Sequence, residues 1–244
     1  MKTSQTKSGL RAKVRSESIN DKPLFDFSEL SFDEFVSFFF NHDIDAEEYW
    51  YQDPAFSSWN DFDEEAIRSP RVIVGHMARL FTNFASIAPK FSLEQINAGI
   101  WAMFTNQPFR LQKHLWLPAT PISERLDCIH SMYSVFSNYV AKSKVEVMEN
   151  CFYMWWDWVA GNFRQQLRFT GDISEGDVSS LNQEQKTLLD AMLQALSRTL
   201  ALSDQRAQQY TLHGLGHFHH PDVRSIVQRY LDKTASCRST QSAG

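Results

Sequence analysis

The sequence predicts an all-α protein, arranged either as an α-solenoid of helix pairs or as an irregular multi-helix bundle. Apolar residues recur at three- and four-residue spacing along most of the chain, which is the period of one helix face. Nine glycines and eight prolines occur in 244 residues, too few for the many tight turns of an all-β chain. The length suits one large domain or two small ones, with a substantial hydrophobic core.

The first helix is predicted near the start of a single domain that we expect to span residues 23–233. Residues 1–22 are polar, lack hydrophobic periodicity and are predicted to form a disordered tail. Ser31 and Glu34 then form a capping-box pattern ahead of a phenylalanine-rich run, which indicates a short apolar helix. This helix belongs to an acidic and aromatic part of the domain, residues 23–66.

Residues 67–170 are predicted to form a helical core. Ser69-Pro70 precedes an apolar stripe, as expected where proline takes the first position of a helix. Ser92 and Gln95 repeat the capping-box pattern before a second helix. A longer stripe over residues 126–140 indicates a third.

The segment 145–169 has helical periodicity and contains a tryptophan-rich run whose rings we expect in the core. Asp157 stands between Trp156 and Trp158, and an acid amid indoles could act as a proton donor. The alternative, which we favour, is a carboxylate turned to solvent or to a local cation such as Arg164.

The C-terminal helices are predicted over residues 182–232, with Asn182 as the cap of the first. Gly214 and Gly216 interrupt the next helix, and each weakens it by roughly 1 kcal/mol relative to alanine. Close approach of a neighbouring helix would offset that cost. Residues 234–244 are predicted to form a second disordered tail.

The turn between the last two predicted helices carries a specific pattern. Leu215-Gly216 lies near the end of one helix, His220 stands at the N-cap, Pro221 takes the first helical position, and Val223-Arg224 follows. Over residues 203–232 this pattern resembles a HEAT-type repeat, in which aspartate usually occupies the position of His220. The resemblance implies helix pairs that stack into a solenoid with a concave binding surface. It implies no particular activity.

The net charge of −5 hides a strong segregation along the chain. Residues 21–66 carry fourteen acidic residues and one lysine, a net charge of −13. Residues 1–20 hold five Lys and Arg with one Glu, and residues 67–244 hold eighteen Lys and Arg with fourteen acids. One acidic segment therefore lies between two parts that are each weakly basic.

Acidic residues are interleaved with tyrosine and tryptophan between Asp43 and Glu65, and we expect this segment to bind a basic surface on another protein. Aromatic anchors and opposite charge are the means by which protein interfaces gain affinity and speed. Such a surface would suit an inhibitor or immunity-type protein that occludes its partner. The alternative is a solvated acidic helix face whose rings lie in the core. The candidate contact residues are Asp43, Asp45, Glu47, Glu48, Tyr49, Trp50, Tyr51, Trp59, Asp61, Asp63, Glu64 and Glu65.

His213 and His217 are four residues apart on one predicted helix, so both imidazoles could reach the same metal ion. Their HGLGH pattern lacks the glutamate of the HExxH metalloprotease motif. No third ligand is evident beyond Asp222 or the distant His76, His114 and His130. We therefore expect partly exposed polar positions and no cofactor. A metal-dependent hydrolase using His213 and His217, or a pH-sensitive structural role, are the alternatives.

The chain is accordingly expected to be a protein-binding module and not an enzyme. It contains no phosphate-binding loop, dinucleotide fingerprint or nucleophile-elbow motif. The basic residues beyond residue 66 leave a nucleic-acid-associated repeat protein as a third hypothesis, although the acidic segment opposes phosphate binding. Three scattered cysteines, no secretory leader and no apolar run of about 20 residues predict a cytoplasmic protein without a membrane partner.

Overall fold

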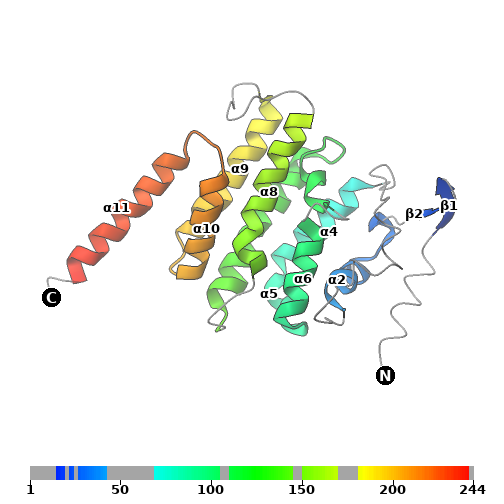
Figure 1. The fold of residues 1–244 in the computed structure, drawn as a ribbon, viewed down its shortest axis with the longest axis horizontal. Helices are drawn as coiled ribbons and strands as arrows, with labels where there is room; N and C mark the ends of the chain where they lie inside the picture. The colour runs from blue at the N-terminus through cyan, green and yellow to red at the C-terminus, as the bar shows by residue number, and fades with distance from the viewer. Residues whose placement is uncertain are drawn as a thin grey trace.

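The structure, a computed structural model, describes residues 15–19, 22–24, 27–42, 69–104, 110–144, 150–169 and 181–241. Most of these residues are helical, which confirms the all-α prediction (Figure 1). The exception is a short antiparallel pair of strands, β1 (Arg15–Ile19) and β2 (Lys22–Leu24). These strands overlap the region predicted to be a disordered tail. The strand sequences RSESI and KPL themselves show no alternation of apolar and polar residues, so periodicity within them could not predict the pairing.

The α-helices are α2 (Phe32–Phe40), α4 (Pro70–Thr82), α5 (Phe84–Ile87), α6 (Leu93–Phe104), α7 (Ile122–Ser134), α8 (Asn150–Phe169), α9 (Gln183–Leu200), α10 (Gln205–His217) and α11 (Val223–Gln241). Short 3-10 helices are η1 (Phe27–Glu29), η5 (Ala88–Lys90), η6 (Leu111–Leu115) and η8 (Val140–Lys142), and η7 (Val135–Tyr139) is a π-helical turn.

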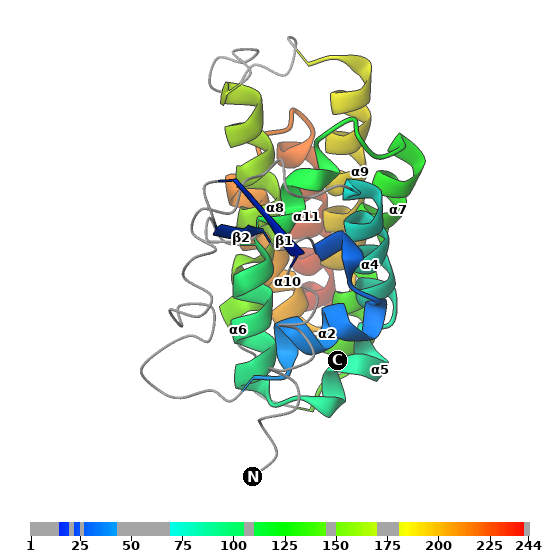
Figure 2. The same cartoon turned by 90° about the vertical axis from the view of Figure 1, so that its right-hand side faces the viewer.

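The longer helices lie in two rows that face each other (Figures 1 and 2). In one row α4 packs against α7 and α7 against α9. In the other row α6 packs against α8 and α8 against α10. α2 lies on α6 at one end of the molecule, and α11 extends from the opposite end. Whether this arrangement is a true solenoid stays a prediction.

The tryptophan-rich run of α8 occupies the centre of the core, as predicted. Trp155 is fully buried, and its ring contacts Phe81 of α4, Phe104 of α6 and Phe136 of η7 at centroid distances of 5.1, 4.9 and 5.8 Å. Edge-to-face aromatic pairs of this kind add stabilisation beyond the area that they bury. One side chain thereby joins both rows of helices.

Three predicted helix starts are confirmed by their capping boxes. Ser31 with Glu34, Ser92 with Gln95 and Asn182 with Gln185 each exchange hydrogen bonds between side chain and backbone. Each box satisfies backbone N–H groups that the first turn of a helix leaves without partners. α4 also begins at Pro70 as expected, but the side chain of Ser69 makes no capping hydrogen bond.

The prediction for the glycines of α10 is correct at Gly214 and wrong at Gly216. A Cβ atom added to Gly214 would lie 2.4 Å from the Cβ of Trp156 on α8, so only glycine permits this helix contact. Gly216 has nothing within 4 Å of that position. A second close approach, absent from the sequence analysis, occurs at Gly99, where a Cβ would lie 2.5 Å from the carbonyl oxygen of Phe39.

The turn into α11 is held by His220, but the helix starts later than predicted, so His220 is not its N-cap. Nδ1 of His220 accepts a hydrogen bond from the backbone N–H of Asp222 within the turn at 3.0 Å. Its Nε2 lies 3.0 Å from Oδ1 of Asp190 on α9. The helix itself begins at Val223 and not at Pro221. It also runs to Gln241, through most of the segment predicted to be a C-terminal tail.

Membrane and disulfide expectations can be checked over the described ranges. None of the helices there is both long enough and apolar enough to span a membrane. Cys128 and Cys151 are buried, and burial raises the pKa of the Cys128 thiol above its ordinary value. A buried thiol of this kind is unreactive, so both cysteines serve packing.

Candidate metal centre

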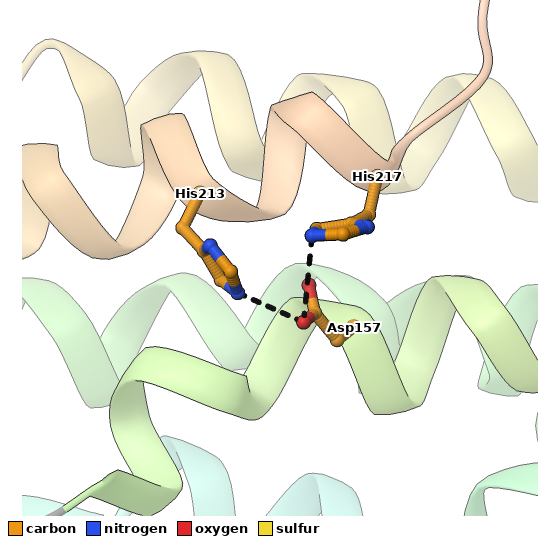
Figure 3. A group of neighbouring side chains, drawn as sticks. All are labelled: Asp157, His213 and His217. Atoms are coloured by element: carbon orange, nitrogen blue, oxygen red, sulfur yellow. Dashed lines mark hydrogen bonds and ion pairs between the residues drawn. The ribbon is translucent and has the colours of Figure 1, made fainter.

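Asp157, His213 and His217 form a compact cluster between α8 and α10 (Figure 3). One ligand atom from each residue lies within 4.8 Å of the others. Nε2 of His213 is 2.9 Å from Oδ2 of Asp157, and Nε2 of His217 is 4.0 Å from the same oxygen. The cluster therefore brings two imidazoles and one carboxylate together from two neighbouring helices.

The local fold explains why these side chains meet. His213 and His217 are one helical turn apart and share a face of α10. Gly214, between them, lets α10 approach α8 at Trp156, the residue next to Asp157. The same close contact that requires glycine thus places the carboxylate opposite both histidines.

The ring of His213 is held by aromatic neighbours. Tyr153, one turn before Asp157 on α8, stacks on it at a centroid distance of 3.9 Å and an interplanar angle of 23°. Tyr153 also packs edge-to-face against Tyr210 of α10 at 5.8 Å. These contacts restrict the imidazole, so its orientation toward Asp157 is fixed by the fold.

Exposure differs across the cluster. The side chains of Asp157 and His213 are 16% and 20% exposed, whereas that of His217 is 60% exposed. Oδ1 of Asp157 is buried and has no hydrogen-bond partner among the described residues. An unsatisfied buried carboxylate oxygen is costly, and a cation bound beside it would remove that cost.

The donor set suits a transition metal. Imidazole nitrogen binds zinc, copper, iron and nickel, whereas magnesium and calcium prefer sites made of oxygen atoms alone. Two histidines and one carboxylate are also the protein ligands of many catalytic zinc sites. The residues present therefore fit a divalent ion of the zinc class.

Asp157 is a candidate third ligand that local sequence patterns do not indicate. Asp157 faces His213 and is only 16% exposed, so it is not turned to solvent as expected. The expected contact with Arg164 involves a side chain outside the described residues and stays a prediction. None of the four residues considered as a third ligand belongs to the cluster, which among the described residues contains Asp157 alone as its acid. Those four residues are Asp222, His76, His114 and His130.

One signal in the sequence could have pointed to this pairing. Gly214 lies between the two histidines and predicts a neighbouring helix against that turn of α10. The third ligand should therefore be sought on whichever helix packs there. In the sequence, Asp157 is distinguished only by its tryptophan neighbours, and nothing local links it to residue 213.

The predicted partner-binding segment, Asp43 to Glu65, lies entirely outside the described residues. The elements on either side of it are described. α2 ends at Phe40 and α4 begins at Pro70, and these two helices pack against each other.

Comparison with known proteins identifies no relative: no protein-family model, no curated protein and no solved structure matches this chain. The site must therefore be interpreted from its own geometry.

Proposed function

We propose that this protein binds one divalent transition-metal ion, of the zinc class, through Asp157, His213 and His217. The observation that supports the proposal is the convergence of their three ligand atoms within 4.8 Å. The unpartnered Oδ1 of Asp157 and the stacking of Tyr153 on His213 favour a prepared site over a chance cluster.

The proposal assigns a distinct part to each residue. Each imidazole would bind through Nε2, the atom that faces Asp157 in both cases. Nε2 must then carry a lone pair, so the remaining proton of each neutral ring moves to Nδ1. Metal binding therefore competes with protons for the two ring nitrogens.

The test uses the full chain after a chelator has removed any bound metal. Zinc is then titrated into the protein, binding is measured by calorimetry, and the bound zinc is quantified by metal analysis. We expect one zinc ion per chain in the wild type. His213→Ala and Asp157→Asn should each weaken binding by about 100-fold or more, because each removes one of only three protein ligands. His219→Ala is the matched control, since this exposed histidine lies close in sequence but outside the cluster. Equal binding by the control and the cluster variants would contradict the proposal.

A second candidate function is the binding of a basic protein partner by Asp43 to Glu65, as for an inhibitor or immunity-type protein. The charge of −13 over residues 21–66 favours it. The firm attachment of both flanking elements supports it further. Arg79 of α4 lies over the ring of Phe32 at 3.9 Å, and Gln95 donates to the carbonyl of His42 at 2.7 Å. The two rows of helices would then serve as a solenoid-like scaffold.

Charge neutralisation tests this second function. The double variant Glu64→Gln, Glu65→Gln is expected to weaken partner capture about 10-fold at low salt, and high salt should weaken capture by the wild type as well. The double variant Asp127→Asn, Asp232→Asn changes the net charge by the same amount outside the acidic segment. Captured partners would be measured by quantitative pull-down from the native host. Equal losses in both variants would rule out a specific acidic contact.

A further inference from the structure

The cluster contains fewer protein ligands than a closed metal site requires. Over the residues that the structure describes, only Asp157, His213 and His217 converge on one point. A structural zinc ion has four protein ligands, whereas a catalytic zinc ion has three and keeps another position for water or substrate. The donor count therefore corresponds to an open site.

The unfilled positions lie on the solvent side. The α8 side of the cluster is closed, because Trp156 is fully buried against Gly214 and Tyr153 covers the ring of His213. His217 is the last residue of α10 and is 60% exposed. Figure 3 shows both imidazoles reaching from α10 to the same carboxylate. An ion held there would be bound by Asp157 on the α8 side. Solvent would reach it beside His217.

Charge determines which ligand such an ion would take. A divalent ion with one carboxylate and two neutral imidazoles keeps a net charge of +1, in a place shielded on one side by apolar rings. A small anion neutralises that charge, and oxygen anions are good ligands for zinc and cobalt. The bound water that such an anion displaces would itself be acidified by the metal.

We infer that the metal ion held by Asp157, His213 and His217 is open to solvent and binds a small oxyanion in exchange for water. This inference rests on the proposed metal binding and adds the ligand class to it. The site is then an exposed Lewis acid, able to hold a carboxylate, a hydroxamate or a phosphate through its oxygen atoms.

Cobalt(II) provides the test, because its visible absorption reports both binding and coordination. The chelator-treated full chain is first titrated with cobalt, which should produce a saturable visible spectrum at one ion per chain. Acetohydroxamic acid, which binds a metal through its oxygen atoms as the anion after releasing its N–OH proton to solvent, is then added. We expect the spectrum to change and to saturate at one hydroxamate per metal. Acetamide, which is similar in size but neutral, is the control and should leave the spectrum unchanged.

The outcomes separate the two proposals. If no protein-bound cobalt spectrum forms, the metal-binding proposal itself fails. If cobalt binds at one ion per chain but hydroxamate leaves its spectrum unchanged, the metal site stands and the open-site inference is overturned. A fourth protein ligand would then close the site. If hydroxamate strips the cobalt from the protein, so that the spectrum becomes that of the free complex, the inference is overturned as well.

Discussion

The Gly214→Ala variant is expected to lose about 3 kcal/mol of unfolding free energy, at the upper end of what overpacking costs. The new methyl group would lie 2.4 Å from the Cβ of Trp156, which cannot yield because its ring is fully buried. α10 must therefore move away from α8. The same movement separates His213 from Asp157, so zinc affinity should fall together with stability.

Gly216→Ala is the matched control on the same helix. Nothing lies within 4 Å of its added methyl group, and alanine favours the helix by about 1 kcal/mol over glycine. We expect this variant to be slightly more stable than the wild type and to bind zinc equally well. Urea denaturation in the presence of chelator measures the stabilities. Similar values for the two variants would show that Gly214 does not lie in close contact with Trp156.

Acid is expected to destabilise the protein strongly through His114. This side chain is 2% exposed, and both of its ring nitrogens lack partners among the described residues. Burial lowers its pKa from 6.5 to about 3, with a smaller contribution from the positive charge of Lys113. Below pH 6.5 the unfolded chain gains a proton that the folded chain cannot accept. Stability is therefore lost as the pH falls from 6.5 toward 3, by up to about 1.4 kcal/mol per pH unit.

Removing the titratable ring should remove this slope. Unfolding free energies at pH 7 and pH 5 would be compared for the wild type, His114→Leu and His114→Gln, all with chelator present. Between these pH values the wild type should lose about 2 kcal/mol more than either variant. The leucine and glutamine side chains differ in polarity, so the unfolding free energies of the two variants can differ from each other. The pH dependence of the unfolding free energy should nevertheless become flatter in both. Parallel pH profiles for all three proteins would contradict the assignment.

Local patterns predicted the helices well because the signals are local. A capping box such as Ser31 with Glu34 acts within one turn, and an apolar stripe is read along one helix. Departures from regular α-helical geometry, in contrast, leave no such signal in the sequence. The stripe over residues 126–140 predicts one continuous helix, but α7 ends at Ser134 and continues as a π-helical turn. The change conserves the buried face, so the apolar pattern contains no trace of it.

Only the two histidines of the candidate site could be paired from the sequence, for a related reason. His213 and His217 are joined by helical spacing, which the sequence shows directly. Asp157 joins them only through the packing of α8 on α10, and that contact depends on tertiary structure. Gly214 and Gly216 look equivalent in the sequence, and only the position of Trp156 distinguishes them. The sequence therefore shows which side chains could bind a metal, but it does not show which helices pack against each other.

The separation of the cluster along the chain has a consequence for the whole fold. Asp157 and His213 are 56 residues apart, and all of α9 lies between them. An ion that joins them would act as a reversible cross-link around a long loop, and closing such a loop is entropically costly for the unfolded chain. Unfolding would then require release of the ion. At a free metal concentration 100-fold above its dissociation constant, the folded state would gain about 2.7 kcal/mol by mass action. The thermal stability of this protein would in that case depend on the metal available to it as well as on its own packing.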